Sequence, residues 1–411
     1  KSSNREAYCL NGGVDFGALD PQLSPDCTMV AFVAKGELYV MSCDDYEFCK
    51  ELIDDDDCIN TYVNTHRRKP TQITYGAREE DTVHDDETMS CDSHDSSDSH
   101  QKRKKYGRVI THGLADFVAQ EEMDRYQGFW WNKDSTGIIF ARVDESYVPP
   151  FRITHQGSDD AIGEQQMYEE HRYPFAGESN PIVSLGYVSI DRDVILSSMP
   201  SIECEKASKD AWSEVKWFNP PEQASEYLAR VNWISGDSVC VQWQDRRQSI
   251  LILEKINVTN GERIMLHSEK SEDWINLHHM FRVLPHAINP KQPLDDDDEP
   301  MMNTGESDLP PGSFSYIFAS ERTGFCHIYL YTFVEGHESA TLVRAISGGE
   351  WIVESILGVD MINDIVYLTG TFDSPLEKHL YALPLSSSRG WDSDKEDRDE
   401  INVVRKSFRN V

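Results

Sequence analysis

The sequence contains no apolar run approaching the ~20 residues that a helix needs to cross a bilayer. We therefore expect no membrane segment in this chain. Basic side chains are also scarce, because 39 Lys and Arg face 72 Asp and Glu and leave a formal charge of −33. A surface of this charge excludes general binding to nucleic acid, whose phosphates attract cationic side chains.

Paired cysteines are absent as well. The nine cysteines are scattered, their number is odd, and no CxxC pair or zinc-ligand spacing occurs. This pattern predicts neither a disulfide framework nor a metal site, and it favours a reducing, cytoplasmic compartment. An extracellular protein with one or two bridges remains the alternative. The chain begins Lys1-Ser2-Ser3 without an initiator Met or a signal peptide, so we expect it to start inside a longer protein.

No Gly-x-Ser-x-Gly nucleophile elbow occurs in the chain. Serine, aspartate and histidine are plentiful, but none of them stands in the setting of a catalytic triad. We therefore expect no catalytic residue in these 411 residues, and nothing in them indicates a cofactor.

Long helical periodicity is nearly absent, and short apolar strands separated by polar turns take its place. One such unit is Arg230–Ile234, the turn Ser235–Asp237 and Val239–Trp243. Units of this kind recur irregularly at about the 40–50 residues of a propeller blade. The length of 411 residues also exceeds one ordinary core, whereas repeats grow by addition. The sequence predicts an all-β repeat fold, with a β-sandwich as the alternative. The segment Val183–Val188 alternates as a half-buried strand does.

Acidic stretches interrupt this pattern. Residues 79–105 join an acidic run to the basic Lys102–Lys105, and the loop 291–312 contains Asp295–Asp298. A third acidic run is Asp54–Asp57. These stretches predict solvated or disordered insertions that add nothing to a core. Calcium binding is disfavoured, because none of them has the ligand spacing and glycine of an EF-hand loop.

Two adjacent carboxylates, Glu121 and Glu122, precede the aromatic strand Phe129–Trp131. Both side chains can face one ligand only on a helix or turn, because neighbours on a strand point to opposite faces. Such a pair can bind one ammonium group through hydrogen bonds worth roughly 1.5–3 kcal/mol each. The alternative is a solvated surface pair of the kind common in acidic proteins.

The stretch Phe117–Trp131 resembles the double-glutamate motif of the dipeptidyl peptidase IV family, within the prolyl oligopeptidase clan. Further segments resemble the same family in the same order, over most of residues 15–385, and those from Trp274 to Phe325 are most similar to its cytosolic branch. These segments are Gly17–Pro21, Leu23–Asp26, Ile110–Ala115, Val143–Ser146, Val148–Pro149, His171–Gly177, Asn180–Pro181, Trp274–His278, Phe318–Phe325, Gly348–Trp351, Thr369–Thr371 and Ser374–Tyr381.

The resemblance implies an eight-bladed β-propeller that caps an α/β-hydrolase domain. Residues 1–411 would form an incomplete propeller of about six to seven blades, with a short helical insertion carrying the glutamates. The hydrolase domain with its Ser/Asp/His triad would lie outside this chain and be its partner. The family is a group of serine peptidases that release Xaa-Pro or Xaa-Ala dipeptides from peptides with a free N-terminus.

The resemblance also implies roles for particular residues. Glu121 and Glu122 would bind the substrate amine, and Phe281 and Arg282 would lie at the substrate cavity, although Arg282 could be an ordinary surface arginine. Residues 149–173 would form an extended arm used in homodimers, with a plain hydrophilic loop as the alternative. For Trp130 and Trp131 we expect core packing.

A second class of function stays open. The missing triad and the acidic insertions also fit a non-catalytic propeller that serves as a protein-binding module. A different exopeptidase of the clan would fit only if the glutamate pair were solvated.

Overall fold

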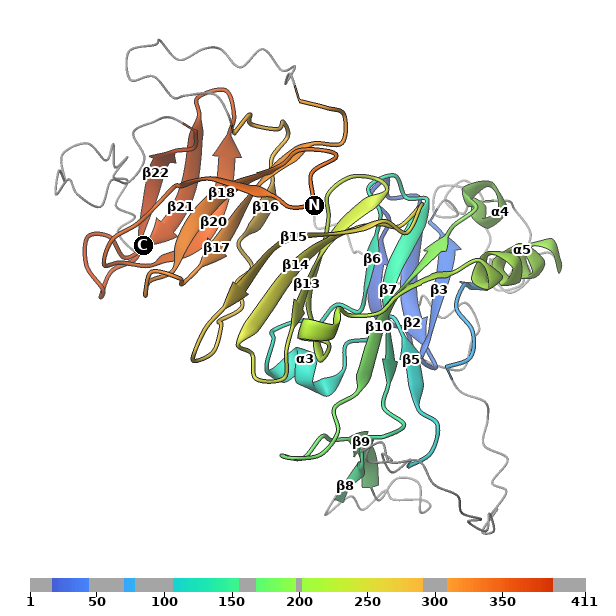
Figure 1. The fold of residues 1–411 in the computed structure, drawn as a ribbon. Coiled ribbons are helices and arrows are strands. Elements are labelled where there is room, and N and C mark those ends of the chain that lie inside the picture. Colours follow the sequence, from blue (N-terminus) through green and yellow to red (C-terminus); the bar gives the residue numbers. More distant parts are fainter. Residues whose placement is uncertain are drawn as a thin grey trace, which may run out of the picture. The chain divides into compact units, whose positions relative to one another are not determined.

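The computed structural model describes residues 17–43, 70–77, 106–154, 168–196, 202–290 and 309–386 (Figure 1). Within them the chain forms antiparallel sheets with few helices, which confirms the predicted all-β class. The predicted insertion at 79–105, the run Asp54–Asp57 and most of the loop 291–312 lie outside the described residues. The chain divides into two compact units, residues 1–238 with 258–261 and residues 239–257 with 262–411.

The first unit contains two larger sheets and a separate hairpin. One sheet has the order β1 (Leu19–Leu23), β2 (Met29–Ala34), β3 (Glu37–Ser42), β4 (Thr71–Gln72). The other has the order β11 (Lys216–Phe218), β10 (Ile182–Ser189), β7 (Gly137–Asp144), β5 (Ile110–His112), with β6 (Phe129–Trp131) also paired to β7. The hairpin is β8 (Pro150–Thr154) with β9 (Tyr168–Arg172). The remaining elements are β12 (Tyr227–Trp233), the helices α3 (Phe117–Glu121), α4 (Arg192–Leu196) and α5 (Ile202–Ser213), and the 3₁₀ turn η2 (Glu222–Ala224).

The second unit is built from consecutive antiparallel strands. Its first strands are β13 (Ser238–Gln244), which starts at the boundary, β14 (Ile250–Asn257) and β15 (Arg263–Lys270). A four-stranded sheet follows with the order β16 (Phe281–Val283), β17 (Phe314–Ser320), β18 (His327–Phe333), β19 (Thr341–Ala345). The last sheet is β20 (Val353–Asp360), β21 (Ile365–Gly370), β22 (His379–Pro384).

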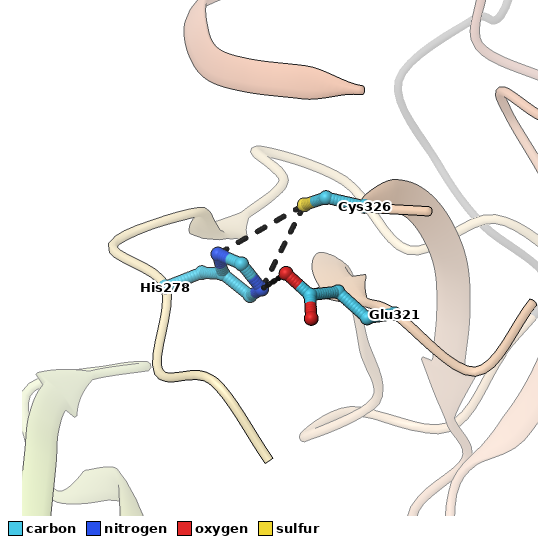
Figure 2. A group of neighbouring side chains, drawn as sticks. All are labelled: His278, Glu321 and Cys326. Atoms are coloured by element: carbon cyan, nitrogen blue, oxygen red, sulfur yellow. Dashed lines mark hydrogen bonds and ion pairs between the residues drawn. The ribbon is translucent and has the colours of Figure 1, made fainter. Parts of the chain in front are cut away.

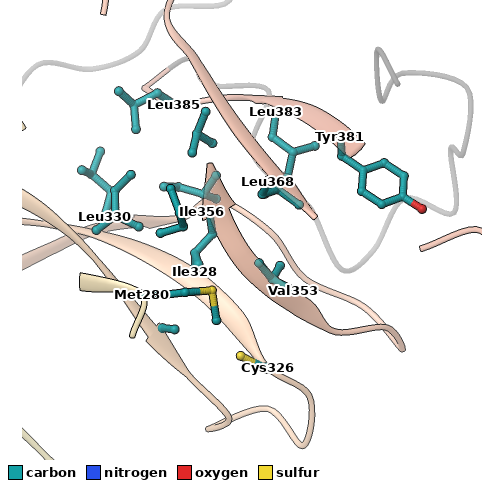
Figure 3. Packing of buried hydrophobic residues seen from close by; sticks show 14 of the residues in the cluster. Met280, Cys326, Ile328, Leu330, Val353, Ile356, Leu368, Tyr381, Leu383 and Leu385 are labelled. Atoms are coloured by element: carbon teal, nitrogen blue, oxygen red, sulfur yellow. The ribbon is translucent and has the colours of Figure 1, made fainter. Parts of the chain in front are cut away.

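The central strands are buried on both faces. Every residue of β2, β17 and β18 is buried, so these sheets are covered on both sides. The expectation of a half-buried strand at Val183–Val188 is wrong for the same reason, because Ser184 and Gly186 of β10 are buried along with the apolar residues. Apolar side chains of the last two sheets pack against one another, among them Ile328 of β18 and Leu368 of β21 (Figure 3).

Sheets in which consecutive strands are neighbours, with the fourth strand outermost, are typical of propeller blades. The number of blades stays a prediction. The relevant consequence for function is that the connections between strands emerge at the ends of rigid, doubly covered sheets, where they can position side chains.

Candidate functional site

The glutamate pair lies at the end of a short capped helix. The side chain of Asp116 accepts a hydrogen bond of 3.0 Å from the Ala119 N–H, which caps the start of α3. The helix ends at Glu121, and the N–H of its C-cap residue Glu122 still donates to the Val118 carbonyl at 2.9 Å. Both glutamates therefore stand on helical backbone, and both are exposed.

The segment that carries α3, here called the excursion, lies between Leu114 and Gln127, and its two ends leave the sheet close together. Leu114 and Gln127 form an isolated antiparallel bridge just before and after the helical segment. A Cβ on Gly128 would lie 2.4 Å from the carbonyl carbon of Gly113, so only glycine permits this approach of the two backbones. Met123, 2% exposed, anchors the middle of the excursion. The glutamates are thus held by the sheet rather than by a free loop.

Two buried arginines bind the backbone of this excursion. Arg125 donates from Nε to the Leu228 carbonyl at 2.9 Å and from Nη1 to the Gln127 carbonyl at 2.7 Å. Arg230 on β12 donates from Nη1 to the Met123 carbonyl at 2.6 Å. Hydrogen bonds from charged donors are among the strongest in proteins, so they fix the turn after α3 to β12.

Burial lowers the pKa of Arg125 to about 10, while Asp116, whose carboxylate lies 3.6 Å away, acts in the opposite direction. Burial also lowers the pKa of Arg230. Arg125 nevertheless remains protonated at neutral pH, so a buried cation lies beneath the glutamate helix. A cation is favourable near the C-terminal carbonyls of a helix. Arg125 is such a cation, because it lies in the segment that follows the C-terminal end of α3.

The glutamate pair itself is placed where it contributes nothing to stability. Negative side chains at the C-terminal end of a helix face the unfavourable pole of its dipole. Throughout the part of the chain that the structure describes, neither carboxylate of Glu121 or Glu122 has a hydrogen-bond or ion-pair partner. Two unpaired carboxylates at the end of a firmly held helix can bind a ligand cation without first breaking an internal contact.

The opposite side of α3 is closed. A cavity of about 10 Å³, room for one water molecule, lies between Asp116, Ala119, Asn180 and Tyr227. Asn180 Nδ2 donates to Glu226 Oε1 and to the Tyr227 hydroxyl, each at 2.9 Å. A ligand of peptide size must therefore approach the glutamates from their exposed side.

The second predicted pair lies in the second unit, on β16. Phe281 is 4% exposed and its ring lies 5.3 Å from that of Tyr316, so it is a core side chain. Arg282, the next residue, is exposed. The structure brings Glu121 and Glu122 together on one helix, and the role of Phe281 and Arg282 at a substrate cavity stays a prediction.

The tryptophans next to the glutamate helix differ from each other. Trp131 is buried in the core of the first unit, as expected. Trp130 is only half-buried, and its carbonyl accepts a hydrogen bond of 3.4 Å from Trp233 Nε1. Reasoning from sequence did not identify Arg125 and Arg230 as supports of the site. The available signal was a charged residue, Arg230, at the start of the predicted strand Arg230–Ile234.

Residues 95–401 match the family described as the dipeptidyl peptidase IV (DPP IV) N-terminal region, and the chain belongs to this family. It is 28% identical over 324 residues to human "Dipeptidyl peptidase 8", an alignment that covers 66% of this chain and 32% of that protein. It is 24% identical over 295 residues to a "Probable dipeptidyl-aminopeptidase B" of Arthroderma otae, covering 69% of this chain and 28% of the relative.

The fold is similar to that in the crystal structure of Porphyromonas gingivalis dipeptidyl peptidase 4, with a TM-score of 0.55 at 20% identity. That likeness covers 89% of this chain and 37% of the other. The chain spans about a third of the length of the curated relatives named above, at 32% and 28%. Among the helices that the structure describes, none is long and apolar enough to cross a membrane.

Proposed function

We propose that this chain is the region of a serine dipeptidyl aminopeptidase that recognises the free N-terminus of a peptide and gates its access to the hydrolase domain. The observation that carries the proposal is the exposed, unpaired pair Glu121 and Glu122 on a helix fixed by buried arginines. The names of the curated relatives support the peptidase class.

In this function the glutamate pair fixes the position of the substrate N-terminus relative to the nucleophile. A peptide ammonium group has three N–H donors, enough to bind both carboxylates at once. Once the amine is held, the distance from it to the nucleophile of the partner domain decides which peptide bond reacts. Positioning of this kind sets the length of the product, here a dipeptide ending in Pro or Ala. Arg282, exposed on β16, would contact the substrate as well.

The direct test uses the whole protein, with this chain and the hydrolase domain together. Glu121→Gln and Glu122→Gln keep the shape of the side chain and remove its charge. We expect each to lower kcat/KM for a chromogenic Xaa-Pro substrate by about 10- to 100-fold, which corresponds to roughly 1.5–3 kcal/mol per charge-assisted hydrogen bond. The melting temperature should not change, because both side chains are exposed and unpaired.

Glu222→Gln is the matched control, since Glu222 is an exposed glutamate of the same unit. It should leave kcat/KM unchanged. A second control is the N-acetylated substrate, whose slow hydrolysis should be the same in all variants because it has no ammonium group to lose. If both Gln variants cleave the free-amine substrate at the normal rate, the proposed role of the pair is wrong.

We also propose that residues 149–173 form an arm that contacts a second copy of the chain. The hairpin of β8 and β9 carries a group of exposed large apolar side chains, continued by the two aromatics that follow it. These are Phe151, Ile153, Tyr168, Tyr173 and Phe175. The Tyr173 ring lies 4.9 Å from that of Phe175 and 5.0 Å from that of Phe117, the first residue of α3. Exposed apolar groups of this kind mark interaction surfaces.

Phe151→Glu tests the arm by placing a charge in the middle of this aromatic group. We expect the variant to change from dimer to monomer in analytical ultracentrifugation, because a buried unpaired carboxylate is costly in an interface. Ile362→Glu is the control, since Ile362 is 95% exposed and lies in the turn between β20 and β21. A dimer that persists in Phe151→Glu, or a monomeric parent protein, would rule out the arm as the contact.

A further inference from the structure

Three side chains with metal-binding chemistry lie in one row at the end of the four-stranded sheet of the second unit. Phe281 of β16 is paired with Phe318 of β17; His278 lies three residues before this pair on its segment, and Glu321 lies three residues after it on the other. Ser320 of β17 is paired with His327 of β18, so one further step places Glu321 opposite Cys326. The antiparallel register therefore brings together residues from three separate segments.

The side chains follow the backbone register (Figure 2). His278 Nε2 lies 3.7 Å from Cys326 Sγ and 3.5 Å from Glu321 Oε1. The ligand atoms of all three residues lie within 4.8 Å of one another. Zn²⁺ binds sulfur at about 2.3 Å and nitrogen or oxygen at about 2.0–2.2 Å, so tetrahedral ligands are separated by about 3.4–3.6 Å. The distance from His278 to Glu321, 3.5 Å, falls within this range, and the distance from His278 to Cys326, 3.7 Å, lies just above it.

We propose that His278, Glu321 and Cys326 form a Zn²⁺ site with an open fourth position. A thiolate, an imidazole and a carboxylate are the three ligand types that zinc uses, and three protein ligands leave one position for water or another ligand. The open position faces the solvent side, because Glu321 is exposed and His278 is half-buried.

The surroundings orient the ligands. Asn276 Nδ2 donates to Glu321 Oε2 at 2.7 Å, which leaves Oε1 directed at the histidine. The Asn276 amide is oriented in turn by Trp274 Nε1, which donates to Asn276 Oδ1 at 3.2 Å. Support of this kind is typical of metal sites, where a ligating carboxylate is itself hydrogen bonded.

The cysteine is held by the protein core. Cys326 is 5% exposed and belongs to the apolar cluster that includes Met280 and Ile328 (Figure 3). Burial, with Glu321 nearby, raises the pKa of its thiol to about 12, so the sulfur is protonated at neutral pH. Binding of Zn²⁺ replaces this proton: the S–H bond breaks, a Zn–S bond forms and one proton passes to solvent.

The site lies directly before the predicted substrate-contact pair, since His278 precedes Phe281 by three residues. A bound ion would tie the segment that leads into β16 to the β17–β18 turn. The metal proposal does not depend on the peptidase function, because it stands on the register and distances within one sheet.

The experiment is a metal titration of the full chain after removal of metal with a chelator. Zn²⁺ is added in competition with a chromogenic chelator, and Co²⁺ is added separately as an optical probe. We expect one tight equivalent of Zn²⁺ and, with Co²⁺, a thiolate-to-metal charge-transfer band. Cys326→Ala and His278→Ala should both lose the tight equivalent, and Cys326→Ala should also lose the band. Asn276→Ala should keep the band and bind Zn²⁺ about 10- to 100-fold more weakly, as expected for a supporting residue.

Cys240→Ala is the matched control, because Cys240 is also a buried thiol of the second unit and has no part in the cluster. It should bind both metals as the parent chain does. The proposal is overturned if no tight equivalent exists, or if Cys326→Ala binds Zn²⁺ and shows the cobalt band as strongly as the parent. The second outcome would place the metal on the acidic runs or on other cysteines.

Discussion

The two units hold basic side chains in different ways. The first unit buries Arg125 and Arg230 as cations whose N–H groups bond backbone carbonyls next to the glutamate helix. The second unit holds the half-buried His267 among aromatic rings, with Tyr331 stacked on it at 4.6 Å and the Tyr316 hydroxyl 3.0 Å from Nδ1. Burial, with Arg322 nearby, lowers the pKa of His267 to about 3, so it is neutral where the arginines are charged.

The comparison distinguishes basic residues that support the candidate site from a basic residue that only packs against aromatic rings. A neutral imidazole in an aromatic stack serves packing, because it needs no partner of opposite charge. A buried guanidinium costs desolvation energy, which is offset only when it makes strong hydrogen bonds. In the first unit those bonds fix the segment that presents Glu121 and Glu122. In the proposed function the arginines are positioning residues, and the comparison can be tested by removing each type of base.

Arg230→Met should have the largest effect. It removes the donor to the Met123 carbonyl while keeping an unbranched side chain in the same space. We expect the free energy of unfolding to fall by about 3 kcal/mol, because a buried carbonyl loses a charged partner. In the whole protein, kcat/KM for free-amine substrates should fall about 10-fold or more, chiefly through KM, because the glutamate platform moves.

Arg247→Met is the control for this change, since Arg247 is exposed in the turn after β13. It should alter neither stability nor kinetics. A stable Arg230→Met protein with normal KM would show that the buried arginine does not position the glutamates.

His267 should produce a smaller effect that depends on pH. Because its pKa is lower in the folded state than the ordinary value of 6.5, the stability of the folded state is fully present above pH 6.5. That stability is lost as the pH falls from 6.5 toward 3, by about 2 kcal/mol at pH 5. In His267→Phe this part of the acid sensitivity should disappear, as measured by denaturant unfolding at pH 7 and pH 5.

His286→Phe serves as the comparison, because His286 is an exposed histidine of the same unit. It should keep the acid sensitivity of the parent chain. Equal loss of stability between pH 7 and pH 5 in His267→Phe and the parent would mean that the folded protein does not hold His267 in its neutral form.

Much of the fold could be predicted from local patterns. The strands that flank Ser235–Asp237 and those that flank Glu321–Gly324 are β12 with β13 and β17 with β18 in the structure. The alternation of apolar and polar residues and the occurrence of turn residues depend only on neighbouring positions, so both can be recognised in the sequence. The burial of both faces of β10 could not be predicted from the sequence, because it depends on which sheets cover those faces.

The same limit applies to the sites. Glu121 and Glu122 are adjacent and could be identified by their spacing and context. The row of His278, Glu321 and Cys326 joins segments that are 43 and 48 residues apart for the histidine and its two partners, and no zinc spacing marks it. Only the register across β16, β17 and β18 brings those three side chains together.

The most direct measurement is the structure of the whole protein with a peptide that has a free N-terminus bound in a form that is not cleaved. We predict that the peptide ammonium nitrogen lies within about 3.2 Å of a carboxylate oxygen of both Glu121 and Glu122. A bound peptide whose ammonium group contacts neither glutamate would contradict the account.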